Sequence, residues 1–197
     1  MADSKGAESR LRASKRFGYS WALADGWEFV DPSLFWPLAP APAIDVYAAQ
    51  HSPQGPFMLM IATDVMHVVP GKHAGDDPED YDRLEGYGAE VLQAAHAELI
   101  NTQRVRMFGL ETVQVTGAQG KLRISIRMLY RGYRKFEFRC FDLDSQSDWR
   151  CASALSAFRV EDLPEPETER DPPQVRHLRD ARFGVAFDAP DDSWRSL

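Results

Sequence analysis

Histidine side chains are the first candidates for chemistry in this chain, because imidazole nitrogens bind metals and exchange protons near neutral pH. The 197 residues include five histidines: His51, His67, His73, His96 and His177. His67 and His73 are separated by Val-Val-Pro-Gly-Lys, a spacing that fits neither two ligands on one helix face nor the usual loop of a zinc site. We therefore expect no metal site among the histidines.

Acidic residues are densest in the segment Gly-Asp-Asp-Pro-Glu-Asp-Tyr-Asp, residues 75–82. Carboxylates at this density could bind calcium, but the spacing of an EF-hand loop, with its central glycine and terminal bidentate glutamate, is missing. The start of a helix explains the acids more simply. Asp77 suits the N-cap, Pro78 suits the first helical position, and carboxylates are favoured near the positive end of the helix dipole. The pattern predicts a helix rather than a cation site.

The two cysteines, Cys140 and Cys151, are the remaining candidates for a nucleophile or a metal ligand. Their spacing does not match a metal knuckle. They could pair as a disulfide, but a cytoplasmic chain would keep them reduced. The sequence also contains no nucleophile elbow, phosphate-binding glycine loop or dinucleotide fingerprint. We predict no catalytic residue, no cofactor and no bound metal, and hence a protein that is not an enzyme.

Two groups of residues are candidates for binding another protein. Phe35 and Trp36 lie in a proline-rich segment, where large aromatic side chains either pack onto the sheet or are displayed as an anchor. Arg123, Arg127 and Arg139 lie on predicted strands, and arginines on the outward face of a sheet suit an acidic partner surface. The alternative for these arginines is ordinary cross-strand pairing on a solvent-exposed face.

Composition and charge narrow the class of protein. With 44% hydrophobic residues, the chain can form one domain with a hydrophobic core. The formal net charge of −7 argues against a nucleic acid partner. No apolar run approaches the roughly 20 residues that a membrane-spanning helix needs. The N-terminal charges are not followed by the apolar stretch of a secretory signal. We therefore expect a cytoplasmic protein without membrane insertion.

The pattern of apolar residues predicts an antiparallel sheet. Alternation predicts strands separated by turn residues, over residues 17–23, 27–30, 44–50, 56–65, 111–117, 121–130 and 135–143. The strand at residues 56–65 is apolar on both faces and is therefore predicted to be central. The hydrophobic pattern favours a three-residue loop at residues 131–133, with Gly132 in the left-handed region, because it places Ile126 opposite Phe138 and Met128 opposite Phe136.

Two helices are predicted to accompany the sheet. Apolar residues at helical spacing predict a long helix from Asp77 to about residue 102. Its stripe comprises Tyr81, Leu84, Gly88, Val91, Leu92, Ala95 and Leu99. A short helix capped by Ser147 or Asp148 is predicted near the C-terminal end of the domain. The side of this helix that rests on the sheet is expected to comprise Trp149, Ala152, Leu155 and Ala157.

Charge and proline content set the expected boundaries. Residues 1–15 are predicted to be a disordered basic tail, and residues 16–160 a single α+β domain. Residues 161–178 are rich in proline and glutamate and are predicted to be a linker. Residues 179–197 form a C-terminal segment that repeats the first strand motif of the domain.

Three motifs resemble the PsbP-like family, which includes PsbP, Ran-binding Mog proteins, and bacterial DcrB-like and Eag chaperone proteins. They are FGYSWALADGW at residues 17–27, GLETVQVTG at residues 109–117 and DWRCASALSAFRV at residues 148–160. The resemblance implies a sheet of about six strands, with a long helix packed on it and a short C-terminal helix. It also implies a binding or chaperone role without a shared catalytic centre. The N-terminus does not resemble the lipoprotein signals or transit peptides of periplasmic and thylakoid members.

The opening phrase of the domain occurs twice. RFGYSWALADGW at residues 16–27 is similar to RFGVAFDAPDDSW at residues 182–194. The second phrase could begin a truncated second domain of a tandem protein, or add a strand to the sheet of this chain. It could also pair with another copy and form a homodimer through residues 182–194. Coincidence is the remaining alternative.

The functional hypothesis that follows is a non-enzymatic, cytoplasmic protein-binding or chaperone-like module. The alternatives are a structural repeat of a tandem-domain assembly and a small metal-dependent hydrolase built around His51, His96 and the acidic cluster. The identity of the protein partner is not encoded in any motif.

Overall fold

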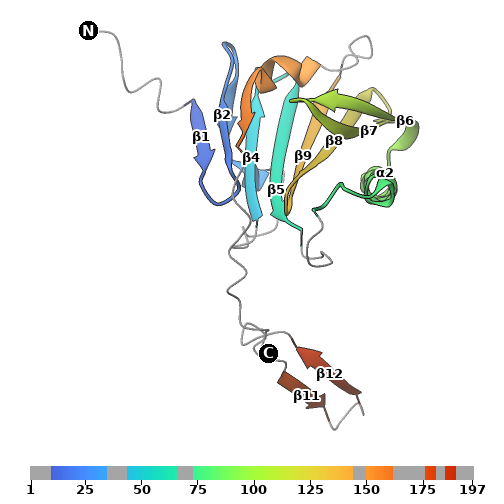
Figure 1. The fold of residues 1–197 in the computed structure, drawn as a ribbon. Coiled ribbons are helices and arrows are strands. Elements are labelled where there is room, and N and C mark those ends of the chain that lie inside the picture. The colour runs from blue at the N-terminus through green and yellow to red at the C-terminus, as the bar shows by residue number, and fades with distance from the viewer. Residues whose placement is uncertain are drawn as a thin grey trace. The chain divides into compact units, whose positions relative to one another are not determined.

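The computed structural model describes residues 10–34, 44–65, 73–143, 150–161, 176–180 and 185–189 (Figure 1). The chain divides into two compact units, Met1–Leu163 and Pro164–Leu197. The first unit contains two antiparallel sheets and one α-helix, α2 (Pro78–Ala94), among its described residues. Its architecture is therefore mostly β.

The larger sheet has seven antiparallel strands in the order β3-β4-β5-β9-β8-β7-β6. The strands are β3 (Glu28–Val30), β4 (Ile44–Gln50), β5 (Phe57–Asp64), β6 (Glu98–Met107), β7 (Leu110–Gln119), β8 (Leu122–Arg131) and β9 (Arg134–Asp142). The predicted central strand is confirmed, because the first six residues of β5 are all buried. β6 was not predicted as a strand.

A smaller three-stranded sheet packs on one face of the larger one. It comprises β1 (Leu11–Ser14), β2 (Tyr19–Ala22) and β10 (Ala157–Val160) in the order β1-β2-β10. Phe17, Tyr19 and Trp21 are at most 1% exposed and pack with aromatic residues of β9 and β10. β1 lies within the range predicted to be a disordered tail, so the ordered domain begins before Arg16. These residues are ordered because they pair with β2. The charged composition of residues 1–15 gives no sign of this pairing.

Helix α2 ends earlier than predicted. Pro78 occupies its first turn as expected. At the other end, the Ala97 N–H donates to the Leu92 carbonyl and the His96 N–H to the Gln93 carbonyl, with His96 at a positive φ of 52°. This is a Schellman ending in which histidine takes the place usually held by glycine. The expected stripe is therefore cut, and Leu99 lies on β6 instead, where it is 49% exposed.

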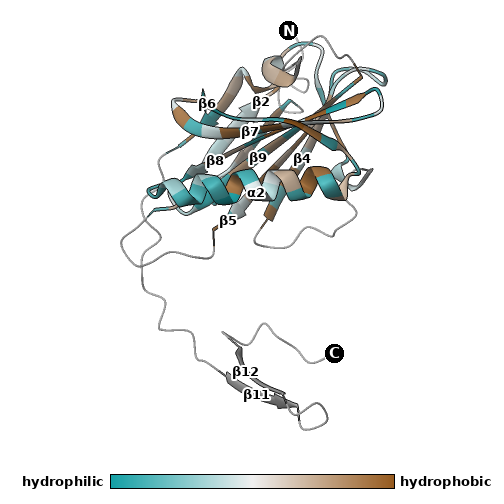
Figure 2. Cartoon of the chain, turned by 90° about the vertical axis from the view of Figure 1, so that its right-hand side faces the viewer, coloured by the Kyte–Doolittle hydropathy of each residue, from teal (hydrophilic) through white to brown (hydrophobic). Residues whose placement is uncertain are grey.

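The helix packs on the opposite face of the large sheet, against β6, β7 and β8 (Figure 2). Its buried residues are Leu84, Gly88 and Leu92. A Cβ atom on Gly88 would lie 2.6 Å from Cγ2 of Val115, so the close approach of helix and sheet requires glycine. The large sheet is thus covered by side chains on both faces.

The predicted register between β8 and β9 is wrong. The loop contains two residues, Gly132 and Tyr133, and Gly132 has the expected positive φ of 57°. Ile126 lies opposite Arg139, and Met128 lies opposite Glu137. The prediction assumed one apolar face, but this sheet has two. The phenylalanines at positions 136 and 138 therefore face the small sheet, while the even-numbered apolar residues of β8 face α2.

The predicted short C-terminal helix is a 3-10 helix, η2 (Arg150–Leu155). Its buried positions are Cys151, Ala154 and Leu155, whereas Ala152 is exposed. Three residues per turn place positions 151 and 154 on one side, which explains why the prediction based on an α-helix missed Cys151 and Ala154 and included Ala152. The predicted burial of Leu155 is confirmed. Residues 144–149, including Trp149, lie outside the described residues.

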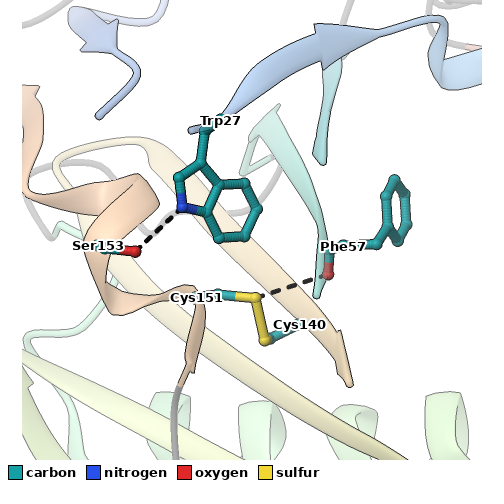
Figure 3. Close-up of a disulfide and its surroundings, with 5 residues drawn as sticks. All are labelled: Trp27, Phe57, Cys140, Cys151 and Ser153. Carbon is teal, nitrogen blue, oxygen red and sulfur yellow. Dashed lines mark hydrogen bonds between the residues drawn. A yellow bond between two sulfur atoms is a disulfide. The ribbon is translucent and has the colours of Figure 1, made fainter. Parts of the chain in front are cut away.

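Cys140 on β9 and Cys151 on η2 form a disulfide, with a Cα–Cα distance of 5.9 Å (Figure 3). Both cysteines are buried. The Trp27 indole N–H donates to Ser153 Oγ beside the disulfide. The expectation of reduced cysteines is therefore not met in the structure. That expectation rested on the predicted compartment rather than on geometry.

The second unit contains a two-stranded antiparallel sheet of β11 (Arg176–Asp180) and β12 (Val185–Ala189). β11 begins inside the range predicted to be a linker. The second copy of the repeated phrase supplies β12, which pairs with β11.

Candidate binding pocket

The three predicted partner-binding arginines do not share one face of the sheet in the structure. Phe35 and Trp36 lie outside the described residues. Arg123 and Arg127 alternate on the face of β8 that looks toward the small sheet, whereas Arg139 lies on the helix face of β9. The common outward face expected for the three arginines is therefore absent, because it depended on the wrong register.

Arg127 is half-buried and belongs to a polar patch on its face of the sheet. Its Nε donates to Gln114 Oε1 at 2.9 Å, and its Nη1 lies 3.9 Å from Met107 Sδ. Burial lowers the pKa of this guanidinium from its ordinary value. Arg123 is also half-buried and lies opposite Asp142 in the strand register. These contacts match the alternative interpretation, in which the arginines make cross-strand interactions.

Arg139 on the opposite face belongs to an ion cluster around a buried carboxylate, which we call the Glu137 cluster (Lys135, Glu137, Arg139 and Tyr87). Glu137 is 0% exposed. Arg139 Nε donates to Glu137 Oε1 at 2.5 Å, and Lys135 Nζ lies 3.4 Å from Glu137 Oε2. Two cations on the same strand face thus compensate the charge that the observed register places beneath α2.

Tyr87 connects this cluster to helix α2. Arg139 Nη2 donates to the Tyr87 hydroxyl at 3.4 Å, and Lys135 Nζ lies 4.0 Å from the centre of the tyrosine ring. Burial, followed by the negative charge of Glu137, raises the pKa of Tyr87 to about 12. The phenol is therefore a neutral hydrogen-bonding group at physiological pH.

A pocket of about 440 Å³ lies beside the Glu137 cluster, where the β4–β5 loop approaches the start of β8 and the end of β9. Its apolar lining residues are Phe57, Leu59, Leu122, Phe141 and Leu143. The other lining residues are Gln50, Pro53, Gln54, Gly55, Arg139 and Asp142. Of the three predicted partner-binding arginines, all of which the structure describes, Arg139 lines this pocket.

Strand pairing and a tight loop shape the pocket. Phe57 and Phe141 are register partners on β5 and β9, and their ring centres are 5.5 Å apart. In the β4–β5 loop, the Gly55 N–H donates to the Ser52 carbonyl at 3.0 Å. A Cβ atom on Gly55 would lie 2.5 Å from Ser52 Oγ, so a side chain at this position would displace the serine hydroxyl. Leu143 adds an apolar side chain that is 64% exposed.

The pocket has the size and lining of a binding site. Small-molecule and side-chain sites typically enclose about 300–1,000 Å³ and combine an apolar lining with a few polar groups. The aromatic and leucine side chains can bind an apolar group, while the guanidinium of Arg139 and the amides of Gln50 and Gln54 can contact oxygens. Among the described residues, no group of three or more histidine, cysteine or acidic side chains is placed to hold a metal ion.

Apart from Arg139, the pocket residues were not predicted as a site. Phe57, Leu59 and Phe141 are strand residues whose alternation indicates burial but not a neighbouring cavity. The one local signal is Leu143, a leucine directly after the last residue of β9. Strand register and the path of the β4–β5 loop bring these residues together, and neither follows from local pattern.

Several of the histidines and acidic residues make ring contacts or backbone hydrogen bonds within the described part of the chain. His51 makes an edge contact with Trp27, and His73 stacks on Tyr133. Asp76 and Asp80 accept hydrogen bonds from the backbone N–H groups of His73 and Gly75. Of the other histidines, His96 ends helix α2, His177 lies on β11, and His67 lies outside the described residues.

Comparisons with known proteins bear on the fold. No family model and no curated protein matches the chain. The chain is similar to the solution structure of cyanobacterial PsbP (CyanoP) from Synechocystis sp. PCC 6803, with a TM-score of 0.50 and 16% identity, covering 81% of this chain and 97% of that chain. A crystal structure from Bacteroides thetaiotaomicron VPI-5482 has a TM-score of 0.39 and 11% identity, covering 87% of this chain and 54% of that chain.

The similarity to CyanoP supports a PsbP-like fold. The predicted α+β domain with one sheet of about six strands is instead mostly β, with a seven-stranded sheet and a three-stranded sheet. The predicted likeness to Mog, DcrB-like and Eag proteins stays a prediction. Among the residues that the structure describes, no helix has the length and apolar character needed to cross a bilayer. The first unit therefore has a mostly β, PsbP-like fold.

Proposed function

We propose that this protein is a non-enzymatic binding module that holds an apolar segment of another protein in the pocket beside Arg139. The observation that carries the proposal is the pocket itself, in which apolar side chains are combined with one arginine, one aspartate and two amides. A chaperone-like role is the concrete version, in which the module covers an apolar client segment that would otherwise be exposed.

The lining defines the kind of segment that fits. One leucine-sized or phenylalanine-sized side chain can pack against the apolar surface that Phe57, Phe141 and Leu122 contribute to the pocket. Complete burial of such a side chain contributes about 1.5–3 kcal/mol. The positive charge of Arg139 is largely compensated by Glu137, so it favours an oxygen of the client chain without dominating the affinity. The expected interaction is therefore weak for one side chain and becomes strong only when the client covers more surface.

Exposed leucines provide a matched test. Leu143→Ser removes an apolar side chain at the pocket, and Leu99→Ser removes one that is similarly accessible on β6. Both substitutions affect exposed positions, so folding is expected to be retained. The probe is 8-anilinonaphthalene-1-sulfonate, which combines an apolar ring system with one negative charge. We expect its affinity to fall several-fold in Leu143→Ser and to stay unchanged in Leu99→Ser.

The same two variants test partner binding. Proteins that co-purify with the wild-type chain are compared quantitatively with those from each variant. Selective loss from Leu143→Ser, with retention by Leu99→Ser, is the expected result. Equal recovery from both variants, together with equal dye affinity, would remove the pocket from the proposal.

The absence of enzymatic activity and the cytoplasmic location also remain proposals. Elemental analysis of the purified full chain tests the hydrolase alternative: stoichiometric zinc or manganese would favour it over a binding role.

A further inference from the structure

The hairpin in the second unit repeats the backbone pairing of the first hairpin in the domain. Ser14 pairs with Tyr19, and Leu11 pairs with Ala22. Asp180 pairs with Val185, and His177 pairs with Asp188. Each residue of the second set lies 166 positions after its counterpart. The two hairpins therefore share both their register and the length of their turn.

The sequence repeat has the same offset. Arg182-Phe183-Gly184 stands 166 positions after Arg16-Phe17-Gly18, at the end of the turn. Residues 181–184 lie outside the described residues, so this part of the comparison is one of sequence. Agreement between register and motif is difficult to explain by coincidence, because a one-residue difference in either turn would separate them.

In the first unit this motif joins the hairpin to the domain. Phe17 is 1% exposed, and Arg16 makes an ion pair with Asp64 of β5 at 2.7 Å. Gly18 has a positive φ of 64°, and its carbonyl accepts a hydrogen bond from the Glu161 N–H at 2.7 Å. The motif thus does more than form a turn: it fits the hairpin to a specific acceptor, which consists of the edge strand β10 and the aromatic core.

The second hairpin has the apolar residues that such an acceptor needs. The counterparts of Phe17, Tyr19, Trp21 and Leu23 are Phe183, Val185, Phe187 and Ala189. All four positions in the first unit are buried. A two-stranded hairpin alone is marginally stable in water, since it has no layer against which to bury one face. The second hairpin therefore requires an acceptor to be stable.

The acceptor in the first unit is already filled by larger, specifically bonded side chains. The Trp21 indole N–H donates to the Ala154 carbonyl at 2.7 Å, and the Tyr19 hydroxyl donates to Asp45 at 3.1 Å. The counterparts, Phe187 and Val185, cannot make these hydrogen bonds and would leave space unfilled. The second hairpin would therefore bind this acceptor less tightly than the first hairpin does.

We infer that residues 176–189 are the first hairpin of a second domain of this fold, and that they dock on the β10-type edge strand and aromatic core of that domain. The order of elements is consistent with a tandem array, because β10 is followed by residues 161–175 and then directly by the hairpin. This inference is independent of the proposed binding pocket.

Transplantation tests whether the second hairpin fits a core of this fold. In the full chain, residues 11–22 are replaced by residues 177–188, which includes the changes Tyr19→Val and Trp21→Phe. We expect cooperative unfolding, a Cys140–Cys151 disulfide that resists alkylation, and a Tm lowered by roughly 15–25 °C, because two buried aromatic side chains are reduced in size. The matched control has one residue deleted from the transplanted turn, which shifts the register, and we expect it not to fold.

A second pair of variants distinguishes two causes of instability: a hairpin sequence that does not fit the core, and the smaller volume of the valine and phenylalanine side chains. One carries only Tyr19→Val and Trp21→Phe in the native hairpin. The other is the transplant with its valine and phenylalanine restored to the native tyrosine and tryptophan. Folding of the restored transplant supports the inference even if the first transplant is too unstable. Failure of the restored transplant while the wild type folds would overturn it.

The acceptor is tested separately by cysteine crosslinking of the full chain. Ser20 pairs with Arg159 across β2 and β10, and the counterpart of Ser20 is Ala186. If the second hairpin docked on another copy of the first unit, Ala186→Cys with Arg159→Cys would form a disulfide-linked dimer. We expect this variant to remain a monomer by light scattering, whereas Ser20→Cys with Arg159→Cys crosslinks within one chain. A linked dimer would replace the inferred second domain with a homodimer through residues 182–194.

Discussion

Removal of the Cys140–Cys151 disulfide should destabilise the domain by about 3 kcal/mol. The sequence separation of 11 closes a short loop, and a crosslink of this length restricts the unfolded chain by roughly that amount. The structural effect adds to this, because the bond fastens η2, whose Ala154 and Leu155 are buried, to β9 in the large sheet. A small domain has a total stability of about 5–15 kcal/mol, so the loss is a substantial fraction.

The double variant Cys140→Ala/Cys151→Ala is compared with the wild type by thermal and urea denaturation, each with and without dithiothreitol. We expect reductant to lower the Tm of the wild type by about 10 °C. We expect it to have no effect on the double variant, which serves as the control for other actions of the reductant. If unreduced wild-type protein reacts with two equivalents of maleimide after denaturation, the disulfide is absent and the reasoning is refuted.

The same thiols test the predicted compartment. Acid quenching of whole cells, followed by alkylation and mass spectrometry, reports the redox state of the pair before lysis. A cytoplasmic protein is expected to carry reduced cysteines. Oxidised cysteines under these conditions would mean that the cytoplasmic prediction is wrong.

Three further predictions follow from the helix, the ion cluster and the aromatic core. Gly88→Ala should lower the free energy of unfolding by about 1–3 kcal/mol, because the added Cβ atom meets side chains of the sheet. Gly86→Ala has open space around the added atom and should raise the free energy of unfolding by up to about 1 kcal/mol. Urea denaturation measures both changes. Tyr87 should titrate near pH 12 in the folded protein, so its contribution to the free energy of unfolding is complete below about pH 10, the ordinary tyrosine value, and is lost as the pH rises toward 12. Absorbance titration of the wild type and Tyr87→Phe checks this. Identical titration curves for the two proteins near pH 12 would contradict it. Trp21→Phe should lower the free energy of unfolding by about 2–4 kcal/mol, because it removes buried volume and leaves the Ala154 carbonyl without its indole donor. A decrease below about 1 kcal/mol in chemical denaturation would contradict the packing described.

Local signals identified most elements of the fold. Alternation located β4, β5, β7, β8 and β9, because each strand has a face that must avoid water. Pro78 and the neighbouring acids located the start of α2, since helix N-terminal chemistry is local. The end of α2 was missed because His96 adopts the left-handed conformation without the glycine that normally signals it. β6 was missed for the same reason, as its first residues were assigned to the helix.

The candidate site could not be predicted from local pattern. The three arginines were placed on one face because a sheet with a single apolar side was assumed. In the structure both sides are covered, so apolar residues occur at odd and even positions and parity no longer fixes the register. Glu137 is an example. A buried carboxylate beneath helix α2 argues against the observed β8–β9 register, but Arg139 and Lys135 lie on the same face of β9 and compensate its charge.

By itself, the sequence determined that an antiparallel sheet carries a helix, which strands have the clearest alternation, and that one hairpin motif is repeated. Each of these depends on residues that are close in the chain. The tertiary structure decided the strand order, the β8–β9 register, the disulfide and the pocket. These features depend on which distant segments pack together. One arrangement is favoured because it buries apolar side chains on both faces of the sheet, and this burial depends on several segments at once.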